Sequence, residues 1–330
     1  MGAVLVTGGA GYIGSHIVRR LQEDDRKVVV LDDLSEGHRE AVPAELLHVG
    51  DFSDCDLVRT ICRDHAVDYV VHMAANCQVG ESVENPAKYY RNNLVNSLAL
   101  LDTVCEAGVK GLVFSSTAAV YGEPVQVPIT EDHPTAPTNP YGETKLAFEN
   151  ALSWYRKAHG LRYVALRYFN AAGAHPDGDI GEDHAPESHL VPLIIQAALN
   201  PDRALKVFGT DYPTPDGTCV RDYIHISDLA AAHVLALAAM DRGAVDGASF
   251  NLGNGEGFSV RDVIRTVEQV VGKPVPVEDA PRRAGDPAVL VASSGLIREA
   301  LGWQPDFPDL LSIIRTAWNW HRRHPNGFNG

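Results

Sequence analysis

Short runs of Val, Leu and Ile alternate with helical stretches through the first half of the chain, and this alternation constrains the fold more than any other feature. Strands that alternate with helices form a parallel sheet with helices on both faces, which predicts a doubly wound α/β fold. The expected strands are VLVTG, KVVVLDD, YVVHMAA, GLVFSS and LRYVALRYF, and the expected helices span 12–23, 53–65, 86–107 and the segment that carries Tyr141.

The sequence changes after Phe169, where a stretch rich in Gly, Pro, Asp and His is typical of a loop. We expect residues 1–168 to form the main domain, with a returning segment at about 222–246. Residues 169–221 and 247–330 are expected to form a smaller α/β cap that binds the substrate. The elements expected beyond Phe169 are a helix at 190–199, the strand LKVFG, the helix SDLAAAHVLALAAM, the strand SFNLGNG, a helix at 259–271 and a terminal helix from Asp309.

Charge and composition exclude several classes of protein. The 330 residues carry a formal net charge of −15, which argues against general binding to nucleic acids or to anionic membranes. No apolar run approaches the length of a membrane span, and the strand-like start leaves no room for a cleavable signal peptide. The five cysteines are scattered without metal-ligand spacing, so we expect reduced thiols in a cytoplasmic protein and no metal site.

The glycines of TGGAGYIG, namely Gly8, Gly11 and Gly14, lie directly between the first strand and the first helix. Glycines at such a turn let the backbone approach a pyrophosphate, which then faces the free N–H groups of the helix. Asp32 ends the second strand, where a carboxylate accepts hydrogen bonds from a ribose and repels a 2′-phosphate. The combination predicts a Rossmann-type domain that binds NAD rather than NADP. A glycine-rich turn without a ligand is the alternative.

The segment TNPYGETK, residues 138–145, places Tyr141 one helical turn ahead of Lys145. Asn139-Pro140 is typical of a helix start, so both side chains face one side of the helix; a surface pair is the alternative. Making tyrosine a phenolate at neutral pH requires a pKa shift of about three units, or roughly 4 kcal/mol. A cation about 5 Å away supplies roughly 3 kcal/mol at an effective dielectric of about 20. Lys145 and a positive nicotinamide together would therefore suffice.

The order of GGAGYIG, FSST at 114–117 and YGETK resembles the extended short-chain dehydrogenase/reductase family. RYFNAAGAHP, DYPTPDGTCVRDYIHISDLA and PRRAGDPAVLVAS resemble the bacterial UDP-glucose 4-epimerases in particular, and the resemblance runs nearly end to end. It implies interconversion of UDP-galactose and UDP-glucose through a 4-keto sugar with bound NAD, and a homodimer. It assigns Tyr141 and Lys145 to catalysis and Thr117 to the substrate 4-oxygen. A backbone-capping role is the alternative for Thr117.

The resemblance also implies which residues bind the two small molecules. For NAD they are Gly8, Gly11, Tyr12, Ile13, Gly14, Asp32, Asp51, Phe52, Met73, Ala74, Ala75, Asn92, Ser115, Tyr141, Lys145 and Phe169. For the UDP-sugar they are Asn170, His189, Leu190, Val207, Phe208, Arg221, Arg283, Asp286 and Val289. Arg221 and Arg283 would hold the diphosphate, because guanidinium forks suit phosphate oxygens; a solvated surface charge is the stronger interpretation of Arg282. Asp51 follows a third strand, where capping of its own loop is the alternative.

Several positions refine this hypothesis. Ala118 and Ala119 stand where related dehydratases carry an acid and a base, and a methyl group moves no proton, which disfavours dehydration. His189 replaces an asparagine of many members, and Cys77 replaces a lysine that contacts the cofactor ribose in some. Val289 takes a position beside the sugar 2-substituent where some epimerases carry tyrosine. Its small size predicts room for UDP-N-acetylglucosamine, unless it is a core strand residue.

Other functions stay open at this point. A different NAD-dependent sugar-nucleotide epimerase or an oxidoreductase would use the same tyrosine-lysine pair. A non-catalytic NAD-sensing regulator is less well supported, because dinucleotide-binding folds can serve that role without the pair that this chain retains.

Overall fold

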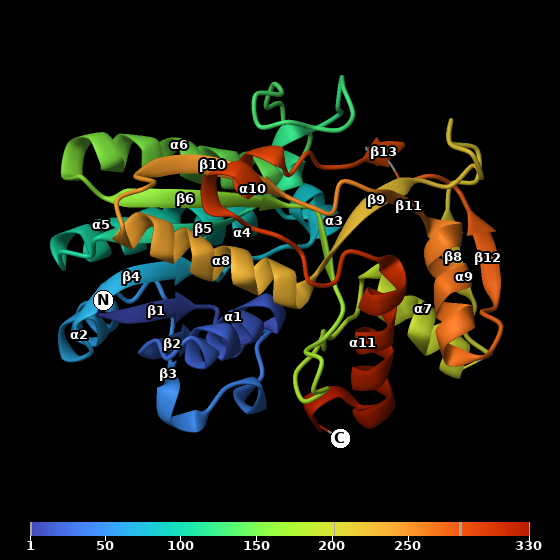
Figure 1. The fold of residues 1–330 in the computed structure, drawn as a ribbon, viewed down its shortest axis with the longest axis horizontal. Helices are drawn as coiled ribbons and strands as arrows, with labels where there is room; N and C mark the ends of the chain where they lie inside the picture. Colours follow the sequence, from blue (N-terminus) through green and yellow to red (C-terminus); the bar gives the residue numbers. More distant parts are fainter. Residues whose placement is uncertain (1, 201, 284–285, 330) are drawn as a thin grey trace.

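The computed structural model describes residues 2–200, 202–283 and 286–329, and its centre is a parallel sheet in the order β10-β6-β5-β4-β1-β2-β3 (Figure 1). The strand order reverses between β1 and β4, which is the doubly wound Rossmann-type arrangement that the sequence predicts. The strands are β1 (Ala3–Thr7), β2 (Val28–Asp32), β3 (Leu47–Val49), β4 (Val67–His72), β5 (Gly111–Thr117), β6 (Arg162–Tyr168) and β10 (Gly247–Leu252).

Helices cover both faces of this sheet. On one face lie α1 (Tyr12–Glu23), α8 (Ile226–Asp241) and α10 (Gly295–Leu301). On the other lie α2 (Cys55–Asp64), α5 (Ser97–Glu106) and α6 (Pro140–His159), with α3 (Val79–Glu84) against α6. The helix expected at 86–107 is built from α4 (Pro86–Tyr89), the π-helical segment η3 (Tyr90–Asn96) and α5. Short 3-10 turns are η1 (Arg39–Ala41), η2 (Ala44–Leu46), η4 (Ala118–Tyr121) and η5 (Gly327–Asn329).

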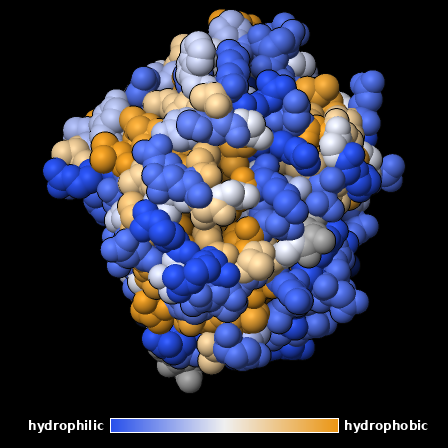
Figure 2. All heavy atoms as spheres, turned by 90° about the vertical axis from the view of Figure 1, so that its left-hand side faces the viewer, coloured by the Kyte–Doolittle hydropathy of each residue, from blue (hydrophilic) through white to orange (hydrophobic). Residues whose placement is uncertain are grey.

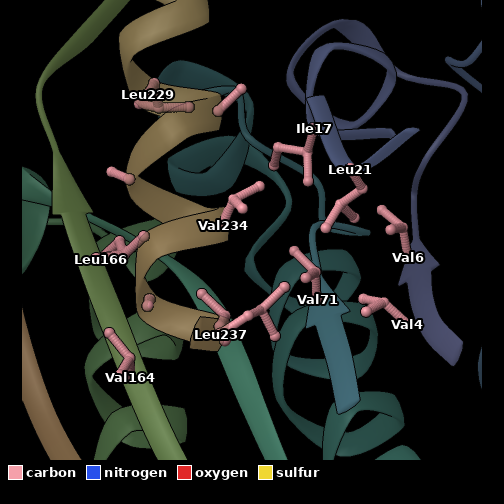
Figure 3. Packing of buried hydrophobic residues seen from close by; sticks show 14 of the residues in the cluster. Val4, Val6, Ile17, Leu21, Val71, Val164, Leu166, Leu229, Val234 and Leu237 are labelled. Carbon is pink, nitrogen blue, oxygen red and sulfur yellow. The ribbon is translucent and has the colours of Figure 1, made fainter. Parts of the chain in front are cut away.

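Apolar side chains fix the direction of α1. Figure 3 shows Ile17 and Leu21 of α1 and Leu237 of α8 gathered near Val71 of β4, and all four are buried. Burying such a side chain contributes about 1.5–3 kcal/mol. The packing therefore holds α1 on the sheet with its amino end at the carboxyl edge of β1.

The smaller unit is built around β9 (Val220–His225). This strand pairs with β7 (Asn170–Ala172), β11 (Gly257–Ser259) and β13 (Val289–Leu290), while β8 (Leu205–Phe208) pairs with β12 (Val277–Ala280). Three helices share a separate apolar core beside these strands: α7 (Leu190–Leu199), α9 (Val260–Val271) and α11 (Leu310–Arg323).

The division of the chain differs from the expectation at one strand. SFNLGNG was assigned to the cap, but the strand it contributes to, β10, pairs in parallel with β6 at the edge of the large sheet. The physical reason is the preceding helix, since α8 packs across β5 and β6 and returns the chain to the open edge of β6. The large unit therefore includes β10 as far as Leu252, and α10 returns to its face, so the boundary expected at residue 247 does not hold.

Figure 2 shows the side of the molecule at the amino ends of the large sheet, where hydrophilic residues dominate and apolar residues form small groups. In the described part of the chain, we find no helix with the length and apolar character needed to cross a membrane.

Candidate functional site

A cavity of about 1500 Å³ lies at the carboxyl ends of β1, β2, β4 and β5 and continues into the smaller unit. Open α/β sheets bind ligands where the strand order reverses. Pockets for one small ligand are usually about 300–1,000 Å³, so this cavity has room for a cofactor and a substrate together. The predicted residues that line it are Gly8, Gly11, Tyr12, Ile13, Gly14, Asp32, Phe52, Met73, Ala74, Ala75, Asn92, Ser115, Thr117, Tyr141, Lys145, Phe169, Asn170, His189, Leu190, Phe208, Arg221, Arg283 and Asp286.

Three other predicted residues are absent from the described part of this lining: Asp51, Val207 and Val289. Asp51 is exposed, and its Oδ1 accepts a hydrogen bond of 2.7 Å from the backbone N–H of Ser53, as the loop-capping alternative expects. Val207 is buried in the core of the smaller unit, because neighbouring strand residues point to opposite faces. Val289 is half-buried on β13 and pairs with Val220.

The glycines of the first turn have different physical roles. Gly8 has φ +70°, and a Cβ there would lie 2.6 Å from the backbone nitrogen of Ala74. A Cβ at Gly14 would lie 2.1 Å from the carbonyl oxygen of Gly8, so close helix packing requires glycine. A Cβ at Gly11 would meet no described atom nearer than 3.5 Å. Gly11 therefore leaves space above the amino end of α1, which has no side-chain cap, and a pyrophosphate fits there.

Asp32 is held rigidly at the wall of the cavity. The side chain is 7% exposed, Oδ2 accepts a hydrogen bond of 2.9 Å from Ala10 N–H, and Oδ1 accepts one of 2.8 Å from Leu34 N–H. Burial raises the pKa of Asp32, while these hydrogen bonds act in the opposite direction. Carboxylate oxygens retain further lone pairs, so the fixed group suits ribose hydroxyls.

The helix start at Asn139-Pro140 is confirmed, and it orients the tyrosine-lysine pair. The Asn139 side chain accepts a hydrogen bond of 2.9 Å from Gly142 N–H, and α6 begins at Pro140. Lys145 is 2% exposed, and its Nζ donates a hydrogen bond of 2.8 Å to the carbonyl oxygen of Ser115. The same Nζ lies 5.8 Å from the centre of the Tyr141 ring. The pair faces the cavity, so the surface-pair alternative is wrong.

The pKa shifts of Tyr141 and Lys145 show how much positive charge the site itself provides and why a cofactor must supply more. Burial raises the pKa of Tyr141 well above 10, and a hydrogen bond with Thr117 opposes this shift. Burial also lowers the pKa of Lys145 to about 8. The protein alone therefore holds Tyr141 as a neutral phenol, and a phenolate requires the positive charge of an oxidised nicotinamide in addition to Lys145.

Thr117 ends β5 directly beside the pair, and it is 9% exposed. Its Oγ1 accepts a hydrogen bond of 3.1 Å from Ala119 N–H, so the capping alternative is observed. The hydroxyl hydrogen is still able to donate, and this hydroxyl lowers the pKa of Tyr141 against the larger effect of burial. The structure thus gives Thr117 both a capping contact and a place in the site.

Guanidinium groups lie at the far end of the cavity. Arg221 is 8% exposed and forms an ion pair with Asp286, which orients its fork. The guanidinium of Arg283 stacks on the Phe208 ring, with 4.2 Å from Cζ to the ring centre. Arg282 instead pairs with a surface aspartate at 2.7 Å, in agreement with its interpretation as a surface charge. Arg221 and Arg283 line the cavity together with Arg203 and Lys206, and both are candidates to meet a diphosphate.

Beneath the site lies a buried ion pair that sequence reasoning missed. Arg167 Nη2 lies 2.6 Å from Glu149 Oε2, and the two side chains are 9% and 5% exposed. Ser116 donates a hydrogen bond to Glu149, and Arg167 donates one of 2.9 Å to the Tyr121 hydroxyl. Glu149 follows Lys145 by one helical turn, and this spacing was the available signal.

His189, which replaces an asparagine of many family members, lies beside two carboxylates. Its Nδ1 lies 2.7 Å from Glu182 Oε1 and 3.4 Å from Glu187 Oε1. Burial lowers the pKa of His189, but the two nearby carboxylates outweigh burial and raise it to about 11. Cys77, the second departure from the family pattern, also lines the cavity.

Comparisons with known proteins agree with this geometry. The model of the NAD dependent epimerase/dehydratase family matches residues 4–253. The chain is 55% identical over 327 residues to a UDP-glucose 4-epimerase of Halalkalibacterium halodurans, covering 99% of this chain and 98% of that protein. Many further curated UDP-glucose 4-epimerases match at about 50% identity over nearly the full chain.

Solved structures give the same result. The UDP-glucose 4-epimerase of Brucella ovis in complex with NAD superposes with a TM-score of 0.93 at 47% identity, covering 96% of this chain and 98% of that one. The enzyme of Bifidobacterium longum in complex with NAD⁺ and UDP superposes with a TM-score of 0.93 at 38% identity, covering 99% and 100%. The family match and the near full-length identity show that this chain belongs to the NAD-dependent epimerase/dehydratase family.

Proposed function

We propose that the protein interconverts UDP-galactose and UDP-glucose by inverting the sugar C4 with bound NAD. The observation that carries this proposal is a single cavity with Tyr141, Lys145 and Thr117 at the sheet and Arg221 and Arg283 at the far end. A sugar linked to a diphosphate matches this arrangement, because the sugar can lie beside the tyrosine while the diphosphate lies beside the arginines. The epimerase relatives support the same substrate.

The side chains provide acid–base chemistry and positioning. Tyr141 removes the proton of the sugar 4-hydroxyl and later returns it to the 4-keto oxygen, while Thr117 holds that oxygen. Lys145 stabilises the phenolate, and NAD supplies a reversible hydride acceptor. Arg221 and Arg283 retain the diphosphate while the sugar turns over, so the hydride returns to the opposite face and C4 inverts.

Ala118 and Ala119 at the end of β5 support epimerisation over dehydration, since neither side chain transfers a proton. The test is to incubate the purified protein with UDP-galactose and no added NAD, and to follow both sugars by NMR and NADH by absorbance. We expect UDP-glucose to accumulate without net NADH. Stoichiometric NADH would indicate an oxidoreductase, and absence of turnover would favour an NAD-sensing protein.

Replacing Asp32 by alanine is expected to weaken NAD retention and to shift preference toward NADP, because the carboxylate binds ribose and repels a 2′-phosphate. The measurement is the dissociation constant for each cofactor by titration calorimetry. Asp64→Ala is the matched control, since it removes the same charge from an exposed side chain that pairs with Arg63 outside the described lining of the cavity. Equal NAD affinity in parent and Asp32→Ala would show that another group holds the ribose.

UDP-N-acetylglucosamine is proposed as a second substrate on the basis of Val289. This residue is half-buried on β13, three positions after Asp286, which lines the cavity. If Val289 sets the space beside the sugar, Val289→Tyr should abolish epimerisation of the N-acetyl sugar and retain that of UDP-glucose. The measurement is kcat/KM for both substrates. An unchanged ratio of the two values would assign Val289 to the strand core alone.

We further propose a cytoplasmic homodimer. The free thiols of the five cysteines support a reducing compartment. Large apolar side chains are exposed on α3, η3 and α6, where α6 contacts both α3 and η3, and exposed apolar residues on adjoining helices support a two-fold interface. Its members are Val83, Tyr90, Val95 and Trp154. Sedimentation equilibrium of the purified protein measures the assembly directly.

A further inference from the structure

Two glutamates and two histidines converge in the loop between β7 and α7: Glu182, His184, Glu187 and His189. Each offers a ligand atom, and the four atoms lie within 4.8 Å of one another. We propose that these side chains bind one divalent transition-metal ion, with Zn²⁺ as the best match. The proposal goes beyond the epimerase function, and it gives His189 the role of a metal ligand in place of the contact with the UDP-sugar that the family resemblance implies.

The spacing of the ligand atoms fits a small tetrahedral ion. His184 Nδ1 lies 3.5 Å from Glu182 Oε1 and 3.6 Å from Glu187 Oε2, and His189 Nδ1 lies 2.7 Å and 3.4 Å from the same two carboxylates. Bonds of about 2.0–2.1 Å in a tetrahedron place the ligand atoms about 3.3–3.4 Å apart. His184 is measured to Glu187 Oε2 and His189 to Glu187 Oε1, and with either oxygen as the ligand two of the three separations are close to that value.

Two atoms of the cluster lack the hydrogen bonds that their burial demands. Glu182 is 4% exposed, and its Oε1 has no hydrogen-bond partner; the same holds for His184 Nδ1. The close approach of His189 to Glu182 does not have hydrogen-bond geometry, although the distance is short. Leaving such a buried atom unsatisfied is destabilising, and a cation at the centre would coordinate both atoms.

The charge and chemistry of the donors select the ion. Two carboxylates with two neutral imidazoles carry a charge of −2, which a divalent ion neutralises. Imidazole nitrogen suits Zn²⁺ better than Mg²⁺ or Ca²⁺, and four close donors favour tetrahedral coordination. Ion pairing with protonated imidazoles is the competing arrangement. A metal ion must displace those protons, so the measured Zn²⁺ affinity includes the free energy of removing them.

The surroundings give the site a structural role. The Trp320 indole of α11 donates a hydrogen bond of 3.1 Å to the carbonyl oxygen of Glu182. The His184 ring lies edge-on to Tyr12 at the start of α1, with 6.2 Å between ring centres. Because all four candidate ligands also line the cavity, a bound ion would brace its edge between α1 and α11. The sequence expectation of no metal considered cysteine spacing and did not weigh this histidine-glutamate cluster.

The test is a Zn²⁺ titration of the full-length, untagged protein after removal of metal by a chelator, with a competing chromophoric chelator as the indicator. We expect about one ion per chain. His184→Gln and Glu182→Gln should each weaken Zn²⁺ by at least about 10-fold, since even outer-shell changes cost that much. His159→Gln, at an exposed position on α6, and His175→Gln, in a second cluster with Asp177 and Asp179, should leave the affinity unchanged.

Parent protein that binds no Zn²⁺, or equal affinity in parent and His184→Gln, would overturn the proposal. Loss of binding in His175→Gln alone would move the site to the second cluster and overturn it as well. Circular dichroism identifies a misfolded Glu182→Gln, in which case His184→Gln decides. Co²⁺ substitution gives a second readout, because tetrahedral coordination produces intense visible absorption. Both measurements use binding, so their failure leaves the epimerase proposal untouched.

Discussion

Replacing Tyr141 by phenylalanine is expected to lower kcat by about 10²- to 10⁴-fold, because the only group removed is the hydroxyl that moves the substrate proton. The ring keeps its place at the start of α6, so the fold and NAD binding should be retained. The measurement is steady-state conversion of UDP-galactose together with the cofactor content of each protein. KM should change little, since the arginines proposed to hold the diphosphate lie at the other end of the cavity.

Tyr155→Phe provides the matched control for this substitution. Tyr155 lies on the same helix and donates a hydrogen bond to Asp102, away from the residues that line the cavity. Its kcat should stay within about 3-fold of the parent value, since the change leaves the reacting groups in place. If Tyr141→Phe showed an equally small effect, another group would have to move the proton.

The parts of the site that were predicted are those in which local chain geometry decides the outcome. Gly8, Gly11 and Gly14 lie within one turn between a strand and a helix, so spacing alone places them beside a pyrophosphate. Tyr141 and Lys145 share a helix face for the same reason. Residues contributed by the ends of different parallel strands meet at one edge of the sheet, which brings Asp32 to the same cavity.

The parts that were missed depend on contacts between distant segments. β10 joins the large sheet because α8 leads the chain back to the edge of that sheet. The alternating sequence pattern of a strand does not indicate which other strand it pairs with. Arg167 lies in a mostly apolar strand. Its burial there is explained by Glu149, which lies on the neighbouring helix and pairs with it. Val207 and Val289 were assigned to the substrate site because of the family resemblance. Whether each side chain reaches the cavity depends on which face of its strand it lies on. Each case needed the tertiary arrangement.

Replacing Glu149 by alanine is expected to lower the free energy of unfolding by about 3–5 kcal/mol, because it leaves the Arg167 guanidinium buried without its counterion. The lost contacts join α6 to β5, β6 and β10, since Ser116, Arg167 and Ser249 all hydrogen-bond this carboxylate. The measurement is urea denaturation at a fixed NAD concentration. Glu143→Ala on the exposed side of the same helix is the control and should cost less than about 1 kcal/mol, the upper range for a charge near a helix amino end.

The same substitution connects stability to catalysis, which gives the prediction a second readout. The negative charge of Glu149 raises the pKa of Lys145 against the larger lowering effect of burial. Its removal should therefore lower the pKa of Lys145 further, so that the ammonium is lost at a lower pH and the alkaline limb of the activity profile moves toward neutral pH. Glu149→Gln keeps the size of the side chain but not the charge, so it should reproduce the shift in the pH profile with a smaller loss of stability. The prediction fails if the free energy of unfolding of Glu149→Ala stays within about 1 kcal/mol of the parent value and its pH profile does not move. Those two results would show that Arg167 finds another partner. The ion pair would then support neither the sheet nor the site.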